Sequence, residues 1–235
     1  MARLTSVAHA DRLRESIRLD RATPGQVLEG TGPVSEGMDT THFSILDRDG
    51  NRVAATLSIN YPFGACFVPP GTGVLLNNEM DDFAAAPGRP NLYGLVQGEA
   101  NAVGPGKRML SSMSPTILLQ DDEVAMVIGT PGGSTIFTSV FQTIVNVLDY
   151  GMTPFEAVAA TRFHHQLLPP DLITYSVTRP LPASTISLLG ELGYRAEPHP
   201  WEFGDVQIVW RDDGDWVPAS DPRDRGDSRV IRIAP

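Results

Sequence analysis

The sequence predicts an α+β fold in which helices cover β-sheets. Strand-like runs occur in pairs around short turns, and two consecutive helical patterns follow the second pair. Strand pairs that alternate with helix pairs favour a layered arrangement of sheets and helices. The chain has 235 residues, of which 41% are hydrophobic, so it is long enough for one sizeable core.

The first part of the chain divides into a helix, a linker and a hairpin. Residues 1–22 have helical character, and residues 23–39 are rich in Gly and Pro, which is typical of a loop or linker. Two strand-like runs follow at 42–47 and 52–60. The turn Arg48-Asp49-Gly50-Asn51 between them is a strong hairpin signal.

A long irregular segment precedes the second strand pair. Residues 61–77 are Gly/Pro-rich, and residues 86–108 form a loop whose length favours either a functional lid or disorder. The next strands are expected at 115–119 and 123–129, around the turn Asp121-Asp122.

The remainder mixes helices and strands. A Pro-Gly-Gly-Ser turn opens a helix at 134–148, and Thr153 with Glu156 forms a capping box for a helix that runs to about His164. A strand near 172–176, a helix near 183–192 and a strand near 206–210 follow. We expect the tail 212–227 to be charged and turn-rich.

Composition excludes several classes of function. The net charge of −10 argues against a nucleic-acid partner, because no basic stripe is present to neutralise phosphates. Cys66 is the only cysteine, so no intrachain disulfide can form, and its Gly-Ala-Cys-Phe setting predicts a packed small residue. No apolar run is long enough to span a membrane. The N-terminus has no apolar signal segment, so either the protein stays inside the cell or its natural beginning lies upstream.

Thr40 is the most informative candidate for chemistry. It stands between the linker and the first strand, in Asp39-Thr40-Thr41-His42. An internal threonine hydroxyl is a poor nucleophile, whereas an N-terminal threonine carries an α-amine that can take the hydroxyl proton. A flexible linker before Thr40 suits self-cleavage there. The alternative is an ordinary strand threonine.

Six short blocks strengthen the first interpretation. They are TTHFS (40–44), SIN (58–60), NNEMDDF (77–83), SSMSP (111–115), TPGGS (130–134) and RFHHQ (162–166). In this order and spacing they closely resemble the γ-glutamyltransferase family, and the resemblance continues more loosely through Ala219-Ser220-Asp221-Pro222-Arg223. It implies the fold of an N-terminal nucleophile hydrolase, an αββα sandwich of two sheets between helix layers. It also implies cleavage of γ-glutamyl amides such as glutathione, with transfer to water, an amino acid or a peptide. No metal or organic cofactor is implied.

The resemblance assigns the nucleophile and its neighbour. Thr40 would attack the Asp39 carbonyl to give an ester that water opens, and the mature Thr40 would then attack the γ-carbonyl of the substrate. Ser58 stands where the family commonly has a second threonine that hydrogen-bonds near the nucleophile, and the change keeps the hydroxyl.

Two further pairs would hold the reacting carbonyl and one end of the substrate. Gly132 and Gly133 match the oxyanion-hole position, where glycine lets backbone N–H groups approach the tetrahedral oxygen at the start of a helix. Ser111 and Ser112 match residues that donate hydroxyl hydrogen bonds to the substrate α-carboxylate.

Asn60, Glu79 and Asp82 match the residues around the substrate α-ammonium. Two carboxylates and an amide carbonyl suit a cation with three donors. Asp82 favours γ-glutamyl over glutaryl substrates, and Asp81 beside it is the weaker candidate. Tyr93 lies where relatives carry a lid whose tyrosine meets the Asn60 position, and such a lid would exclude water.

The histidines are expected to be structural. His164 and His165 are adjacent in an expected helix, so they point in different directions and cannot easily share one ion. His42 is interpreted in the same way.

The resemblance also sets expectations about partners. Residues 1–39 match the end of a large subunit and the linker before the processing site, and residues 40–235 match the catalytic small subunit. A large subunit of the same precursor would form the heterodimer and supply an arginine for the substrate carboxylate, so the chain alone is expected to be weak or inactive. Family resemblance suggests a periplasmic or secreted location. The alternatives are a glutaryl- or cephalosporin-type acylase, and an uncleaved, non-catalytic remnant.

Overall fold

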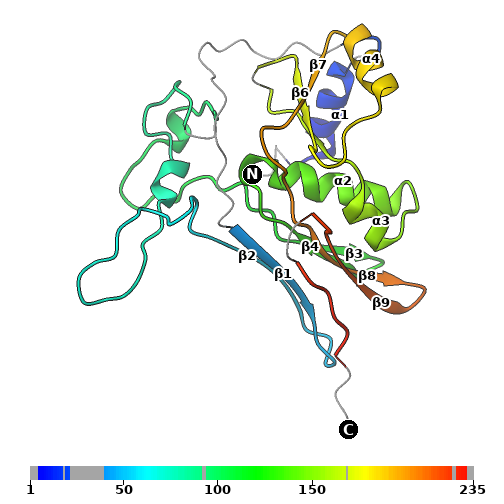
Figure 1. Cartoon of the computed structure of the whole chain (residues 1–235), viewed down its shortest axis with the longest axis horizontal. Helices are drawn as coiled ribbons and strands as arrows, with labels where there is room; N and C mark the ends of the chain where they lie inside the picture. Colours follow the sequence, from blue (N-terminus) through cyan, green and yellow to red (C-terminus); the bar gives the residue numbers. More distant parts are fainter. Residues whose placement is uncertain are drawn as a thin grey trace.

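Two β-sheets packed face to face form the centre of the molecule. The structure, a computed structural model, describes residues 5–17, 19–21, 40–91, 94–167, 169–223 and 226–231. A two-stranded sheet contacts one face of a four-stranded sheet, and helices α2 and α3 lie on the other side of the larger sheet (Figure 1). The order of these layers is strands, strands, helices, which agrees with the expected α+β class.

The small sheet is the predicted hairpin. Strands β1 (Thr40–Leu46) and β2 (Arg52–Ser58) pair antiparallel, with Thr40 opposite Ser58. The turn is stabilised by Asp47, whose Oδ1 accepts from the backbone N–H groups of Asp49 (2.9 Å) and Asn51 (2.8 Å). Gly50 adopts φ of 86°, which glycine tolerates without strain. The prediction of a hairpin is therefore confirmed.

The larger sheet has the order β3-β4-β8-β9 and is antiparallel throughout. Its strands are β3 (Thr116–Gln120), β4 (Glu123–Gly129), β8 (Gln207–Asp212) and β9 (Asp215–Ser220). Strand β4 is buried on both faces over its last five residues, because it lies between the hairpin and the helices. Strand β9 falls inside the tail predicted to be turn-rich. That prediction was wrong because a turn at 213–214 returns the chain along β8, a pairing that charge composition does not reveal.

The helix layer closes the core. Helix α2 (Ile136–Leu148) buries an amphipathic stripe, and α3 (Pro154–Ala159) packs beside it and against β8 and β9. The shared core of sheet and helices contains Met126, Ile128, Val140, Val147, Ala157, Val158, Val206, Ile208 and Ala219. The capping box of Thr153 and Glu156 is confirmed.

Helix α3 is shorter than predicted. It ends at Ala159 because Ala160 turns extended, and His164 lies in a short strand, β5 (Phe163–His164). Carbonyls at the end of the helix have no partner within it, and two arginines supply one. The Val158 carbonyl accepts a hydrogen bond from Arg162 and another, 2.8 Å long, from Arg223 Nη1.

The two arginines belong to a buried ionic cluster. Arg162, Asp221 and Arg223 have side chains at most 2% exposed, and Asp221 forms ion pairs with both arginines. Glu202 adds an ion pair to Arg223 at 3.2 Å. Arg162 also donates to the Gly204 carbonyl at 2.9 Å. Because the charges are paired and bonded to backbone, the cluster joins the end of α3 to the end of β9 and the segment before β8.

A third sheet lies beyond the helices, with the order β5-β6-β7. Strands β6 (Leu172–Tyr175) and β7 (Arg195–Pro198) are parallel and are joined through α4 (Ala183–Glu191). The first helix, α1 (Val7–Ser16), begins at Ser6, whose hydroxyl accepts from the His9 N–H group. None of the helices in the described ranges is long and apolar enough to cross a bilayer.

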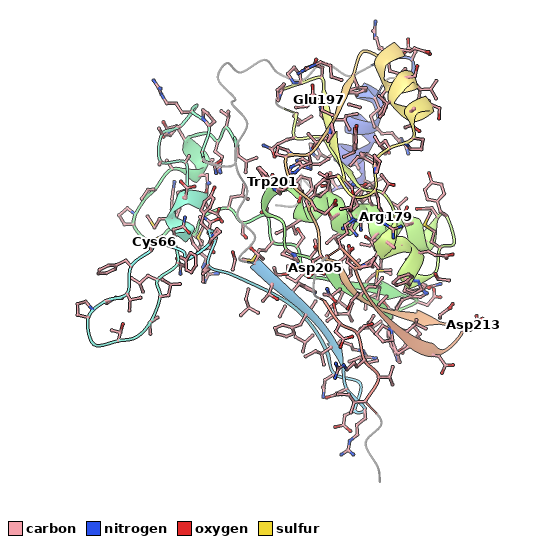
Figure 2. The ribbon with its side chains drawn as sticks, in the orientation of Figure 1. Cys66, Arg179, Glu197, Trp201, Asp205 and Asp213 are labelled. Atoms are coloured by element: carbon pink, nitrogen blue, oxygen red, sulfur yellow. The ribbon has the colours of Figure 1, made fainter. Side chains whose placement is uncertain are left out.

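An irregular arm joins β2 to β3 and lies apart from the α-helices (Figure 1). It contains two 3-10 helices, η1 (Glu79–Asp82) and η2 (Glu99–Asn101). Cys66 lies on this arm and is exposed (Figure 2), so the expectation of a packed cysteine was wrong. Its loop is held by backbone bonds to Leu76, which leave its side chains outside the core.

The hairpin is fitted to the larger sheet by His42 and Gly129. His42 is buried, and its ring nitrogens lie 2.7 Å from Thr56 Oγ1 and 3.1 Å from Ser44 Oγ. A Cβ atom at Gly129 would overlap the His42 ring. The Ser44 hydroxyl in turn donates to the Gln207 carbonyl of β8 at 3.1 Å. Glycine at 129 therefore sets how closely the two sheets approach.

We predict that Gly129→Ala destabilises the protein by about 1–3 kcal/mol, as overpacking of a filled core does. Removing the ring in the double variant His42→Ala/Gly129→Ala should recover part of that loss, since the two changes share one contact. Urea unfolding of the single and double variants measures both effects.

Gly190→Ala is the matched control. Gly190 lies in α4 with open space around its Cα atom, so alanine there should be neutral or slightly stabilising. Strict additivity of the His42 and Gly129 effects would contradict the contact between the sheets.

Candidate active site

A pocket of about 370 Å³ opens at the seam between the two central sheets. It lies where β1 begins and where the turn after β4 leads into α2. Eight of the ten residues predicted from the sequence line it: Thr40, Ser58, Asn60, Glu79, Asp82, Ser111, Ser112 and Gly133. These residues come from five of the six sequence blocks, so the fold brings separate parts of the chain together as the blocks predict.

Thr40 and Ser58 form the hydroxyl pair at the base of the pocket. They are direct partners across the hairpin, and their Oγ atoms are 2.9 Å apart, with either able to donate. Ser58 Oγ also accepts from the Asn60 backbone N–H group at 2.9 Å. Ser58 thus holds the Thr40 hydroxyl in one position and leaves it open to the pocket.

Asn60 turns the chain from β2 into the pocket wall. It is buried and has φ of 71°, a left-handed conformation in which asparagine is one of the favoured residues. Its side-chain amide donates to the Asn78 carbonyl at 3.2 Å, and Asn78 Oδ1 accepts from Tyr61 N–H at 3.0 Å. These bonds place the start of η1 beside the end of β2.

Glu79 and Asp82 form an acidic wall on η1. Residues three apart lie on the same side of a 3-10 helix, so both carboxylates face the pocket, whereas Asp81 does not line it. The pKa of Asp82 is raised to about 7, first by burial and then by the neighbouring Glu79 carboxylate. Glu79 Oε1 is buried and has no hydrogen-bond partner among the described residues. Two neighbouring carboxyl groups of this kind could receive a cation.

Ser111, Ser112 and the glycine turn form another part of the pocket lining. Ser112 Oγ donates to the Gly133 carbonyl at 2.7 Å, and Ser111 Oγ accepts from Met113 N–H at 3.2 Å. Gly133 lines the pocket at the start of the 3-10 turn η3 (Gly133–Thr135), which runs into α2. A helix start supplies N–H groups and positive potential for a developing oxyanion.

Gly132 supports this turn from outside the pocket lining. It has φ of 133°, and a Cβ atom there would lie 2.7 Å from Thr135 Oγ1. The Gly132 carbonyl accepts from the Thr135 hydroxyl at 2.7 Å, which closes the turn. A side chain at 132 would open it.

Two predicted positions lie outside the described residues. They are Tyr93, expected on a lid, and Asp39, expected to precede the cleaved bond. Residues 22–39, which include the expected linker at 23–39, also lie outside them.

The histidines do not take part in the pocket lining. Burial lowers the pKa of His42 and of His164 to about 4, so both rings are neutral at pH 7. His164 Nδ1 lies 2.9 Å from Thr138 Oγ1, and His165 Nε2 lies 3.0 Å from the Pro170 carbonyl oxygen. These contacts are those of packed and hydrogen-bonded residues, as the sequence predicts, although His164 lies in a strand and not in a helix. Within the described ranges, no three His, Cys, Asp or Glu side chains cluster as metal ligands would.

Several pocket residues were missed from the sequence. Leu95, Leu110, Met113, Ile136 and Phe137 form an apolar side, and Gln97, Ser114 and Ser134 add polar atoms. Met113, Ser114 and Ser134 lie inside the blocks SSMSP (111–115) and TPGGS (130–134), which is the local signal that could have identified them.

Comparison with known sequences decides the family. The protein-family model described as Gamma-glutamyltranspeptidase matches residues 1–231 of the chain. The chain belongs to the γ-glutamyltranspeptidase family. The resemblance seen in the sequence blocks is thereby confirmed.

Curated relatives agree with this membership. The chain is 46% identical over 232 residues to a protein named glutathione hydrolase proenzyme from Pseudomonas aeruginosa, covering 99% of this chain and 41% of the relative. It is 45% identical over 221 residues to the protein of the same name from Escherichia coli, covering 94% and 38% respectively. The chain therefore spans about two fifths of the length of these relatives.

Solved structures share the fold. A γ-glutamyltranspeptidase from Pseudomonas nitroreducens complexed with L-DON superposes with a TM-score of 0.78 at 49% identity, covering 82% of this chain and all of that one. A cephalosporin acylase from Bacillus halodurans matches at a TM-score of 0.73 but 27% identity, covering 94% of this chain and 38% of that one. The N-terminal nucleophile hydrolase fold is thus confirmed.

The raised pKa of Asp82 predicts a pH dependence of stability. A carboxyl whose pKa is about 7 in the folded state and near 4 when unfolded keeps its proton in the folded protein between those pH values. The unfolded chain then binds fewer protons, so the free energy of unfolding falls as pH rises from about 4 to 7. Asp82→Asn should remove this slope and be more stable than wild type at pH 8.

Urea midpoints at pH 4.5, 6 and 8 measure the effect. Asp212→Asn, which removes an exposed carboxylate at the end of β8, is the control and should keep the wild-type slope. Parallel pH profiles for wild type and Asp82→Asn would contradict the burial of this carboxyl.

Proposed function

We propose that this protein transfers or hydrolyses γ-glutamyl groups through an acyl-enzyme on Thr40. The observation that carries the proposal is one pocket that combines the Thr40 hydroxyl, a glycine turn at a helix start and an acidic wall. Acyl transfer needs a nucleophile, oxyanion donors and a means of orienting the substrate, and each is present on a different element.

The first step would create the nucleophile. Thr40 Oγ attacks the Asp39 carbonyl carbon, the C–N bond breaks, and the Thr40 nitrogen leaves as an amine that takes the hydroxyl proton. Water then hydrolyses the resulting ester and releases a carboxylate at Asp39. The new Thr40 has a free α-amine beside its hydroxyl, which can act as its base. Ser58 keeps the hydroxyl aligned through the 2.9 Å contact.

The second step would act on the substrate. Thr40 Oγ attacks the γ-carbonyl carbon, and the backbone N–H groups around Gly133 stabilise the oxyanion. The amine leaving group departs with a proton, which leaves a γ-glutamyl ester on Thr40 Oγ. Water, an amino acid or a peptide then attacks this ester, takes the γ-glutamyl group and restores the Thr40 hydroxyl. No step requires a metal or an organic cofactor.

The acidic wall favours γ-glutamyl donors. Glu79 and Asp82, with the Asn60 side chain, would receive the α-ammonium, and a bound cation would draw the proton from Asp82. Ser111 and Ser112 would receive the α-carboxylate. A glutaryl group lacks the ammonium and would leave both carboxylates facing each other, which argues against a glutaryl- or cephalosporin-type acylase.

The preceding polypeptide of the precursor is the proposed partner. The pocket lining within the described residues contains no lysine or arginine, so the substrate carboxylate finds hydroxyl groups but no positive charge there. An arginine from a large subunit would complete it. The relatives are named as proenzymes, which supports a heterodimer made by cleavage. A lid that carries Tyr93, and a periplasmic or secreted location, are part of the same proposal.

Donor preference tests the proposed function. The precursor, with its preceding polypeptide, should release p-nitroaniline from the γ-glutamyl derivative far faster than from the glutaryl derivative. Asp82→Asn should lower kcat/KM for the γ-glutamyl donor by about 30- to 160-fold, since a charge-assisted contact is worth roughly 2–3 kcal/mol. The glutaryl rate should change little.

Asp81→Asn is the matched control, because Asp81 does not line the pocket. It should retain wild-type preference. Turnover that survives Thr40→Ala, or an equal rate with both donors, would argue against the proposed function.

A further inference from the structure

Asn101 lies at the junction of the two walls that would hold the ends of a γ-glutamyl donor. It ends η2, is half-buried and does not line the pocket. Its contacts reach the acidic wall on one side and the serine wall on the other. Neither the sequence blocks nor the proposed mechanism gives it a role.

On the acidic side, Asn101 is bonded to the residue that carries the key carboxylate. Its Nδ2 donates to the Asp82 carbonyl at 2.7 Å, and its backbone carbonyl accepts from Ala84 N–H at 3.0 Å. Gln97 reinforces this side, because its amide donates to the same Asp82 carbonyl at 3.3 Å and its Oε1 accepts from Asn101. Two side chains therefore fix the end of η1.

On the serine side, Asn101 holds the residue next to Ser111. Its Oδ1 accepts from the Leu110 backbone N–H at 3.0 Å. Leu110 lines the pocket, and Ser111 and Ser112 follow it directly. Ser112 then bonds to the Gly133 carbonyl at 2.7 Å. A continuous series of bonds runs from Asp82 through Asn101 to the glycine turn.

We infer that Asn101 is a positioning residue that sets the separation between the Asp82 carboxylate and the Ser111–Ser112 hydroxyls. This inference rests on the proposed function and extends it to donor selectivity. One amide can do this because its nitrogen donates and its oxygen accepts in opposite directions. An ammonium and a carboxylate on one carbon need both walls at a fixed spacing, whereas a glutaryl donor uses only the serine wall. Asn101 should therefore affect γ-glutamyl donors more than glutaryl donors.

Two substitutions separate the two halves of the contact. Asn101→Ala removes both bonds. Asn101→Asp keeps an oxygen for Leu110 N–H but loses the donor to the Asp82 carbonyl. Asn51→Ala is the matched control. This substitution also removes an amide hydrogen bond, the one that Asn51 Nδ2 donates to Asp47 Oδ2 at 2.7 Å, but it does so in the exposed hairpin turn.

Amide hydrogen exchange at single-residue resolution measures the contact between Asn101 and Leu110 without requiring turnover. In Asn101→Ala, Leu110 N–H should exchange about tenfold faster, as the loss of one hydrogen bond allows. In Asn101→Asp and Asn51→Ala its protection should remain. Ala84 N–H, which donates to the backbone of Asn101, is the internal reference and should stay protected in all three variants. Unchanged exchange at Leu110, or equal acceleration at Ala84, would overturn the inference.

Donor kinetics of the precursor test the contact between Asn101 and the Asp82 carbonyl. Both Asn101 variants should lower the ratio of γ-glutamyl to glutaryl kcat/KM at least tenfold, chiefly through KM, while Asn51→Ala keeps the wild-type ratio. Equal losses with both donors would overturn the inference and leave the proposed function intact. A wild-type precursor that does not turn over the γ-glutamyl donor would instead defeat the proposed function, and hydrogen exchange at Leu110 would still decide whether Asn101 joins the two walls.

Discussion

The packing of the β1–β2 hairpin against the four-stranded sheet is the contact on which the site depends. Thr40 and Ser58 lie on the hairpin, whereas the glycine turn follows β4 of the other sheet. A shift between the sheets would separate the Thr40 hydroxyl from the proposed oxyanion donors at the glycine turn. His42 prevents such a shift, because its neutral ring fills the space above Gly129 and its hydrogen bonds stay within the hairpin. A charged or smaller side chain would loosen the seam, since close packing tolerates neither an unpaired charge nor a void.

The rest of the molecule holds the larger sheet in place behind that seam. Helices α2 and α3 bury its far face, and the paired charges of Arg162, Asp221 and Arg223 join α3 to the end of β9. Breaking such a buried group by removing one partner is costly, because the remaining charge stays without compensation. The irregular arm has little apolar core of its own, and side-chain amides such as Asn101 hold it instead. Packed sheets and helices thus support one part of the pocket, and hydrogen bonds of the irregular arm hold the other.

Local signals explain which features could be predicted. The hairpin turn at Gly50 and the capping box of Thr153 and Glu156 depend on residues a few positions apart, and both were predicted correctly. The six sequence blocks are also short, and eight of the ten candidate residues lie together in one pocket. Strand β9 and the end of α3 were missed, because each depends on partners far away in the sequence. Asn101 was missed for the same reason, since its partners lie on two loops and no local pattern marks it.

The central claim is that Thr40 is assembled as a nucleophile, and cleavage before it is the most direct evidence. The purified protein would be incubated and its products followed by intact mass and N-terminal sequencing, beside Thr40→Ala. The account predicts a new N-terminus at Thr40 in the wild type and an uncut Thr40→Ala chain. A wild-type chain that stays whole, or a Thr40→Ala chain that is cut at the same bond, would contradict it and favour an uncleaved, non-catalytic module.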